Sequence, residues 1–308
     1  MLKISHLSKS FDKVQAVNDI SLEVKQGEIF GFLGPNGAGK TTTISMIAGL
    51  LKPDSGTIEV DSMNIQRSPQ RIRGIMGVVP QDMAFYEELT ARENLRFWGR
   101  LQGMSGKDLE QQIQYYLNKI GLKGREDDPL KKYSGGMKRR INLIIGLLHN
   151  PRLLLLDEPT IGIDVQTKMS ILESIREASQ KGTTTVYTTH NLFEAEDLCD
   201  RIAIMDQGKI LAVGTLEELI QIVGEKDIAL IQGEFSTDQA QKIISQEKGI
   251  EVITMKHGYL AISLDASKKI PSLMKSFFNL GVSMDDISLK QPNLESVFLK
   301  LTGRELRE

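Results

Sequence analysis

Residues 34–41 read Gly-Pro-Asn-Gly-Ala-Gly-Lys-Thr, a spacing of glycines, one lysine and one hydroxyl group that is suited to binding phosphate. Glycine lets backbone N–H groups turn inward around a phosphate, where a Cβ atom would clash. Lys40 could then reach the terminal phosphates, and the Thr41 hydroxyl could ligate Mg²⁺. A strand-like run precedes the loop and a helix-like run follows it, so we predict a nucleotide site at this turn. The predicted nucleotide contacts are Gly34, Pro35, Asn36, Gly37, Ala38, Gly39, Lys40, Thr41 and Thr42.

A second group of chemically useful residues, Asp157 and Glu158, follows the run of leucines at 153–156. Consecutive apolar residues between Pro151 and Pro159 predict a strand buried on both faces, as in the centre of a parallel sheet. Parallel sheets bind ligands at the carboxyl ends of their strands. Asp157 is therefore expected to hold Mg²⁺ through water, and Glu158 to polarise an attacking water. Taken alone, the segment could also be a core strand that ends in two solvated carboxylates.

The segment 133–140, Tyr-Ser-Gly-Gly-Met-Lys-Arg-Arg, lies between these two groups in the chain. Ser134 and Gly136 precede a predicted helix, 137–148, so a hydroxyl, free backbone N–H groups and a helix dipole would face an anion. In isolation the segment could be a glycine-rich helix start with a serine N-cap. Its position between the other two motifs favours the anion site.

The order of these motifs resembles that of the nucleotide-binding subunits of ABC (ATP-binding cassette) transporters, in which Ser-Gly-Gly is the signature motif. The resemblance covers roughly residues 1–220. Gln81, after a Val-Val-Pro strand end, matches the family's Q-loop, and residues 161–164 match its D-loop. His190 matches the switch histidine, and Phe11 matches the aromatic A-loop. The cofactors implied by the resemblance are ATP and Mg²⁺.

The resemblance implies a role for each matching residue. Phe11 would stack on adenine, and His190 would contact the γ-phosphate and hold the attacking geometry together with Glu158. From the residues alone, Gln81 could be a turn residue, His190 a structural histidine and Phe11 an ordinary core residue. The implied catalytic residues are Glu158, His190, Gln81 and Lys40, and the implied Mg²⁺ ligands are Thr41, Gln81 and Asp157.

The resemblance also implies a head-to-tail homodimer that sandwiches two ATP molecules. Each ATP would be held by Lys40 of one chain and by the signature motif of the other. Two motifs depart from the family pattern: in the signature, Tyr133 and Met137 replace the usual Leu and Gln, and in the D-loop the frequent Leu-Asp-Pro is Ile163-Asp164-Val165. They bear on rates and on local packing. The residues implied to reach across the dimer are Ser134, Gly135, Gly136 and Asp164.

The composition agrees with a subunit rather than a whole transporter. The chain has 308 residues, of which 40% are hydrophobic, enough for one large domain and a smaller one. A net charge of −2 argues against a general nucleic-acid binder, and a lone Cys199 fits a reducing cytosol. No apolar run reaches the roughly 20 residues of a membrane span. We therefore expect a protein peripheral to the cytoplasmic face of the membrane, with the pore in a separate permease.

The fold expected for residues 1–223 is α/β, a P-loop NTPase of the ABC nucleotide-binding type with a helical subdomain at about 83–150. Helical patterns separated by glycines occur between Gln81 and Ser134, where the family docks the coupling helices of its permease. Aromatic residues in this region could anchor that contact or belong to the subdomain core. They are Phe85, Tyr86 and Trp98.

Residues 224–308 no longer match the cassette and predict a small α+β domain. The order strand, helix, strand, strand, helix, strand is that of ferredoxin-like domains. The tail at 291–303 resembles the ending of subunits that serve ABC-2 type exporters. The domain could regulate the homodimer, stabilise it, or cap the chain without chemistry. The predicted elements are strands 228–231, 250–255, 259–263 and 282–289, helices Thr237–Gln246 and Ile270–Leu280, and a last helix after Pro292.

The sequence therefore predicts an ATPase subunit that powers export of a drug, antibiotic or lipid-like compound through an ABC-2 type permease. The competing class is a soluble ABC ATPase acting in DNA repair or translation. DNA-repair relatives insert a long coiled coil into the cassette, and translation relatives carry two cassettes, features that this sequence lacks. A slow nucleotide-gated sensor is a third hypothesis, which Lys40, Asp157, Glu158 and His190 make less attractive.

Overall fold

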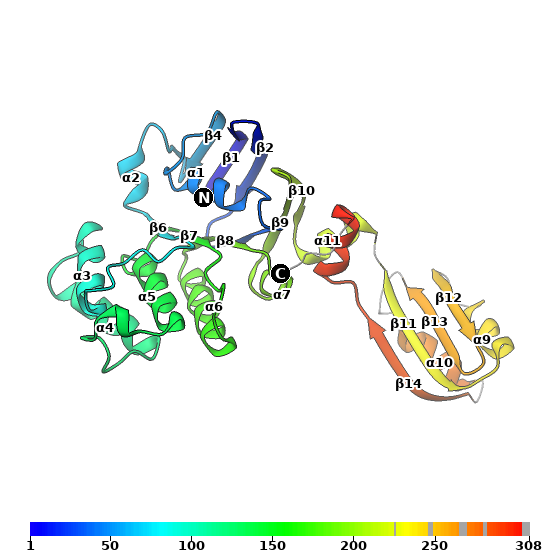
Figure 1. Cartoon of the computed structure of the whole chain (residues 1–308). Coiled ribbons are helices and arrows are strands. Elements are labelled where there is room, and N and C mark those ends of the chain that lie inside the picture. The colour runs from blue at the N-terminus through cyan, green and yellow to red at the C-terminus, as the bar shows by residue number, and fades with distance from the viewer. Residues whose placement is uncertain (225, 246–248, 265–269, 280–281, 304–308) are drawn as a thin grey trace. The chain divides into compact units, whose positions relative to one another are not determined.

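The computed structural model describes residues 1–224, 226–245, 249–264, 270–279 and 282–303 (Figure 1). The chain divides into two compact units, the first ending at Thr215 and the second beginning at Leu216. The sequence predicted this boundary after residue 223. The boundary lies earlier in the structure because helix α8 (Leu216–Val223) contacts α11 (Leu294–Thr302) and so falls in the second unit. No helix among the described residues is long and apolar enough to cross a membrane.

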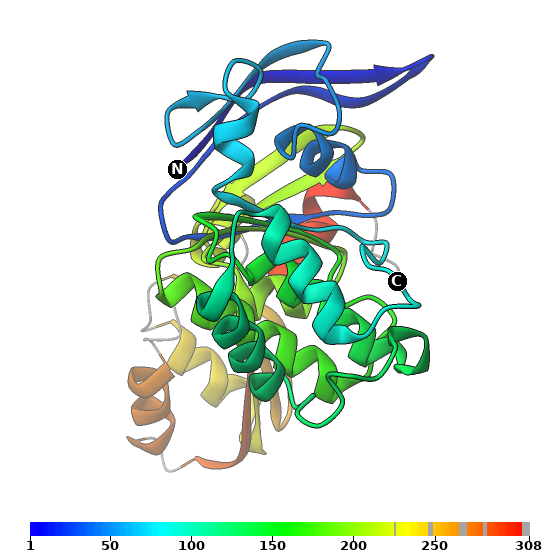
Figure 2. The same ribbon diagram turned by 90° about the vertical axis from the view of Figure 1, so that its left-hand side faces the viewer.

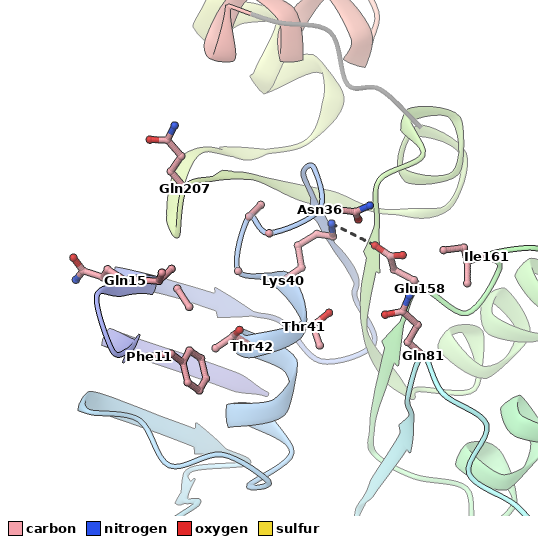
Figure 3. A pocket seen from close by; sticks show the side chains of 15 residues that line it. Phe11, Gln15, Asn36, Lys40, Thr41, Thr42, Gln81, Glu158, Ile161 and Gln207 are labelled. Carbon is pink, nitrogen blue, oxygen red and sulfur yellow. Dashed lines mark ion pairs between the residues drawn. The ribbon is translucent and has the colours of Figure 1, made fainter.

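A six-stranded sheet forms the centre of the first unit, in the order β10-β9-β3-β8-β7-β6. All neighbours are parallel except β10, which is antiparallel to β9. The strands β3, β7 and β8 thus end at one edge, where the chain places Lys40 and Glu158 (Figure 3). The strands are β3 (Ile29–Leu33), β6 (Met76–Val79), β7 (Leu153–Asp157), β8 (Thr184–Thr189), β9 (Arg201–Asp206) and β10 (Lys209–Gly214).

The leucine run of β7 is buried on both faces of this sheet, as predicted. Leu153 and Leu155 join one core cluster, and Leu154 and Leu156 join another. The first cluster lies against an antiparallel sheet and helix α1, and Figure 2 shows strands of that sheet in blue at the top. These elements are β1 (Leu2–Phe11), β2 (Val14–Val24), β4 (Ser55–Val60), β5 (Met63–Asn64), α1 (Lys40–Ile47) and α2 (Pro69–Arg73).

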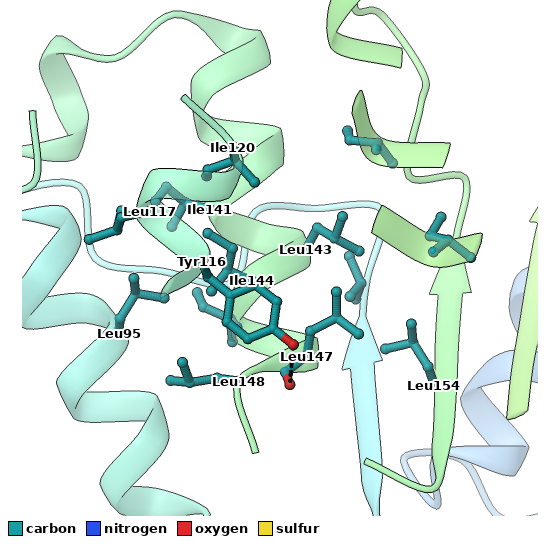
Figure 4. Close-up of a cluster of buried hydrophobic side chains, with 14 of the residues drawn as sticks. Leu95, Tyr116, Leu117, Ile120, Ile141, Leu143, Ile144, Leu147, Leu148 and Leu154 are labelled. Carbon is teal, nitrogen blue, oxygen red and sulfur yellow. Dashed lines mark hydrogen bonds between the residues drawn. The ribbon is translucent and has the colours of Figure 1, made fainter. Parts of the chain in front are cut away.

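The second cluster lies under the helices on the other face of the sheet (Figure 4). It joins α3, α4 and α5 to β7, and the Tyr116 hydroxyl donates to the Leu147 carbonyl at 3.4 Å. Thr90 and Glu93 form a capping box that fixes the start of α3. The helices are α3 (Ala91–Leu101), α4 (Gly106–Lys119), the 3₁₀ turn η1 (Leu130–Lys132), α5 (Gly135–Leu147), α6 (Val165–Gln180) and α7 (Leu192–Leu198).

The three aromatic residues of the helical region divide between core and surface. Phe85 and Trp98 are partly buried and pack against the second cluster. Tyr86 is 53% exposed and makes an edge-to-face contact with Phe97, with ring centroids 5.3 Å apart. Of the three, Tyr86 is therefore the most available to a partner.

The second unit has the predicted ferredoxin-like topology. Its four strands form an antiparallel sheet in the order β12-β13-β11-β14, with a core that includes Phe235 and Phe277. Gln246 and Leu280, the predicted ends of its two inner helices, lie outside the described residues. The last helix, α11, buries Leu294, Val297 and Phe298. The remaining elements are β11 (Asp227–Glu234), α9 (Thr237–Ile244), β12 (Ile250–Lys256), β13 (Tyr259–Leu264), α10 (Ile270–Asn279) and β14 (Ser283–Lys290).

Candidate functional site

The phosphate loop connects β3 to α1 and encloses the side chain of Lys40. The Lys40 ammonium donates to the carbonyl oxygens of Gly34 and Pro35, at 2.6 and 3.1 Å, and the residue is only 4% exposed. Burial lowers the pKa of Lys40, and the nearby Glu158 carboxylate opposes that shift. The lysine is therefore held at the start of α1, where a phosphate group would meet the unsatisfied N–H groups of the first turn.

Two glycines of the loop cannot be replaced without a clash. A Cβ atom on Gly34 would lie 2.2 Å from the Met205 carbonyl oxygen of β9. Gly39, the N-cap of α1, has φ 104°, and a Cβ there would lie 2.4 Å from the Ala16 carbonyl oxygen. Gly37 also has positive φ, at 81°, but faces open space. The close approach of β9 and β2 thus gives the loop the shape of a phosphate cradle.

The Asp157 carboxylate lies beside the start of α1. Its Oδ1 accepts from the Thr41 hydroxyl at 3.2 Å and from the Thr188 hydroxyl at 2.7 Å. Thr188 also accepts from the Glu158 backbone N–H at 3.0 Å, so one hydroxyl positions both acidic residues. Sequence reasoning missed Thr188, although it lies in the polar strand that ends at His190. A hydroxyl and a carboxylate oxygen at this separation form a donor set that fits Mg²⁺.

Glu158 connects the loop to the end of β8. Its Oε1 lies 3.2 Å from His190 Nδ1 and 3.4 Å from Lys40 Nζ, with the Glu158 side chain 7% exposed. Glu158 has φ 46°, a left-handed conformation that is strained for a residue with a side chain. The structure thus brings Lys40, Glu158 and His190 together.

Lys40 and Glu158 border a cleft of about 690 Å³, whose described lining does not include His190 (Figure 3). One wall carries Gln81 and Ile161, and the other carries Phe11, Gln15 and neighbouring residues of β1 and β2. Phe11 is 47% exposed, so its ring is available for stacking. The loop residues that line the cleft are Asn36, Gly37, Ala38, Gly39, Lys40, Thr41 and Thr42.

Gln81 is held from behind by the helix that follows the signature motif. Arg139 Nη1 donates to the Gln81 carbonyl at 2.7 Å. Asn142 donates to the Pro80 carbonyl at 3.1 Å and accepts from the Ala84 N–H at 3.0 Å. Sequence reasoning missed Arg139 and Asn142 because nothing in the local pattern relates α5 to the Q-loop.

The signature segment lies apart from the cleft, because none of the described lining residues comes from it. Ser134 is the exposed N-cap of α5 and accepts from the Met137 N–H at 3.3 Å. A Cβ on Gly135 would meet open space, whereas one on Gly136 would lie 2.8 Å from Thr167 Oγ1. The segment is therefore an exposed helix start outside the described lining of the cleft.

Asp164 lies near the signature segment and caps α6. Its carboxylate accepts from the Thr167 N–H and hydroxyl, at 2.9 and 2.7 Å, and these hydrogen bonds lower the pKa of Asp164. Of the two replacements in the signature, Tyr133 is buried and donates to the Arg125 carbonyl at 2.5 Å. Burial raises the pKa of Tyr133 to about 12. Met137 packs against the second core cluster, so both replacements serve local packing.

The fold and the cleft define a nucleotide-binding cassette, and the family model "ABC transporter" matches residues 17–161. The chain belongs to the ABC transporter family as an ATP-binding subunit, an ATPase whose hydrolysis of ATP drives transport. It is 39% identical to the linearmycin resistance ATP-binding protein LnrL of Bacillus subtilis (strain 168), over 100% of both chains. It is 35% identical to the daunorubicin/doxorubicin resistance ATP-binding protein DrrA of Streptomyces peucetius, over 98% of this chain and 92% of that protein.

Solved structures show the same cassette. An ATP-binding subunit of an ABC transporter has a TM-score of 0.68 and 31% identity, covering 73% of this chain and 93% of that one. A dimeric ATP-binding cassette in a post-hydrolysis state, bound to ADP and Pi, has a TM-score of 0.64 and 25% identity, covering 70% of this chain and 98% of that one. The predicted family, fold class and ATPase activity are confirmed, and ATP or ADP is the ligand that the cassette binds.

Proposed function

We propose that this chain is the ATPase of an exporter for a drug, antibiotic or lipid-like compound, working as a homodimer on a separate transmembrane permease. The likeness to LnrL and DrrA supports this proposal because it extends through the second unit and not only through the cassette. The names of both relatives refer to resistance to an antibiotic. In this proposal the chain lies at the cytoplasmic face of the membrane, peripheral to it, and does not bind nucleic acid.

The arrangement of Glu158 supports a direct role in ATP hydrolysis. Its Oε1 contacts both Lys40 and His190. A γ-phosphate that enters the cradle would compete for Lys40 and free the carboxylate to polarise a water. His190, on the other side of Glu158, would then hold the water and the phosphate in line. Lys40 would neutralise phosphate charge, and Gln81 would approach from the opposite wall of the cleft.

We place Mg²⁺ beside Thr41, Asp157 and Gln81. When bound, Mg²⁺ would neutralise charge on the β- and γ-phosphates. Thr188 orients the Asp157 carboxylate, and Arg139 holds the Gln81 backbone, so both ligands have support within this chain. Phe11 would stack on the adenine ring.

The second half of each nucleotide site would come from another copy of this chain. Ser134, Gly135 and Gly136 begin α5 on the surface, and the N–H groups of a first helical turn suit a γ-phosphate. Asp164 lies close to them and would act across the same interface. ATP binding would therefore close two chains head to tail, and hydrolysis would reopen them.

The Glu158→Gln variant tests this mechanism. We expect kcat to fall at least ~100-fold, the range of general-base catalysis, with ATP binding retained. Glu28→Gln is a matched control, because Glu28 is also buried and paired, with Arg201 at 3.0 Å, at the start of β3. Unchanged turnover in Glu158→Gln would remove Glu158 from the mechanism.

The exporter assignment needs a second experiment. The membrane protein encoded beside this chain should have about six spans and should co-purify with it. Co-expression of the two should lower sensitivity of a host to an amphipathic antibiotic, and the Glu158→Gln variant should abolish that protection. Co-purification with ribosomes or nucleic acid alone would contradict the assignment.

A further inference from the structure

Glu194 is a buried carboxylate in α7 to which the mechanism above gives no role. It is 5% exposed and is not among the described residues that line the cleft. A buried carboxylate is costly unless its charge is paired and its oxygens accept hydrogen bonds. Its surroundings meet both conditions.

Both oxygens of Glu194 are occupied. Oε2 accepts from the hydroxyl groups of Tyr187 and Thr160, each at 2.7 Å, and from that of Thr189 at 3.1 Å. Oε1 lies 2.7 Å from the Lys168 ammonium. Burial would raise the pKa of Glu194, but hydrogen bonds from Lys168, Tyr187 and Thr160 hold it below its usual value. The carboxylate is therefore charged and fully paired.

The partners of Glu194 come from the segments that carry the reacting groups. Thr160 follows Glu158 by two residues, and Thr189 immediately precedes His190. Lys168 lies in the first turns of α6, whose N-cap is Asp164. One side chain thus bonds to the segments of the general base, the switch histidine and the D-loop.

We propose that Glu194 is a positioning residue for ATP hydrolysis, one that fixes the segments of Glu158, His190 and Asp164 relative to one another. This role of Glu194 rests on the proposed role of Glu158 as the general base. It adds a requirement for the geometry of the site and does not add a new reacting group. Glu194 acts through its hydroxyl and ammonium partners and does not touch the nucleotide. Displacement of reacting groups by about 1 Å costs on the order of 100-fold in rate, so a loosened network should slow the chemical step.

The Glu194→Gln variant keeps the shape of the side chain and removes its charge. We expect kcat to fall about 10- to 100-fold while KM and the Kd for ATP change less than about threefold. Glu28→Gln loses a comparable buried ion pair at the start of β3 and should lower Tm without this fall in kcat. If Glu194→Gln does not fold, Tyr187→Phe and Thr160→Val each remove one hydroxyl from the network and should give smaller losses of kcat.

A double variant separates positioning from general stability. In the Glu158→Gln background, single-turnover hydrolysis should show little further slowing when Glu194→Gln is added, because the placement of the His190 and Asp164 segments relative to Glu158 no longer matters once the base is absent. Additive slowing in that background, or a kcat of folded Glu194→Gln within twofold of the parent, would overturn the proposal. If Glu158→Gln itself turns over normally, the proposed function fails first, and the two failures are thereby distinguished.

Discussion

The loop around Lys40 and the segment around Ser134 have similar components, because each combines glycines, a hydroxyl side chain and the start of a helix. The loop lies inside a cleft whose walls come from β1, β2 and the Q-loop, and its lysine is buried. The Ser134 segment is exposed, and Gly135 faces open space. The Lys40 loop is thus enclosed by other parts of the same chain, whereas the Ser134 segment is exposed on the surface.

This difference shows how the nucleotide site is divided. In the proposed mechanism, a phosphate bound at Lys40 meets the loop, Asp157, Glu158 and His190 of a single chain. In the same mechanism, the signature helix adds donors when a second chain approaches. Binding should therefore depend on the loop, and turnover on both places. Substitutions at the two places test that division.

Lys40→Met should weaken nucleotide binding strongly and lower turnover with it. The substitution keeps the length of the buried stem but removes a charged donor, and hydrogen bonds to charged groups contribute about 1.5–3 kcal/mol each. Loss of two such hydrogen bonds from Lys40 to the phosphates should raise the Kd for ATP at least ~100-fold. Calorimetric titration measures this, with the exposed Lys52→Met as control. Retained affinity would mean that the loop does not bind the phosphates.

Ser134→Arg should separate binding from turnover. The added side chain blocks the start of α5, so ATP should still bind at Lys40 while kcat falls at least ~100-fold, as when one preorganised donor is lost. Ser105→Arg is the matched control, because Ser105 is also an exposed N-cap of a helix in the same subdomain. Normal turnover with Ser134→Arg would show that the signature segment has no role across the dimer.

Gly135→Ala tests the same surface more gently. A Cβ at this position meets nothing within its own chain, so Tm should stay the same. A nucleotide of a second chain would meet that Cβ, and kcat should fall about tenfold, a loss of ~1.4 kcal/mol of transition-state binding. Gly74→Ala, at the end of α2, makes only ordinary contacts and should change neither quantity. Equal kcat values for Gly135→Ala and Gly74→Ala would contradict a contact between Gly135 and the nucleotide of a second chain.

Asp164→Asn should have the smallest effect of these substitutions, a pH-dependent loss of stability of the folded chain. Hydrogen bonds from Thr167 lower the pKa of Asp164 below 3.8, so the ionised carboxylate stabilises the folded chain above that pH. The unfolded chain takes up the proton first as the pH falls, and the stabilisation disappears as the pH passes below the folded pKa. Urea unfolding should therefore show a gap between parent and variant at pH 6 that narrows toward pH 3. A gap independent of pH would assign the effect to packing.

Much of the site was predictable because its residues lie at the ends of strongly patterned elements. The glycine spacing before Lys40 identified the loop, and the leucines of β7 placed Asp157 and Glu158 at the edge of a parallel sheet. His190, which closes the next strand of the sheet, was assigned by its match to the switch histidine of the family. These patterns are local, and each requires only neighbouring residues to be recognised.

The contacts that support the site could not be predicted, because they are not local in sequence. Arg139 donates from α5 to the Q-loop. Glu194 accepts hydrogen bonds from hydroxyl groups near the ends of two strands and pairs with a lysine of α6. Such contacts depend on tertiary packing between segments distant in sequence. The structure also separated the aromatic residues of the helical region, placing Phe85 and Trp98 partly in the core and leaving Tyr86 exposed.

The position of β3 in the sheet has a consequence for the synthesis of the chain. β3 carries the phosphate loop, yet it pairs with β8 and β9, and a carbonyl of β9 closes the cradle at Gly34. The ribosome therefore makes the entire loop motif long before the strands that give it shape. A chain halted before residue 200 would contain every residue of the motif and none of its walls from β9. We therefore expect such a truncated chain to bind nucleotide more weakly than the complete cassette.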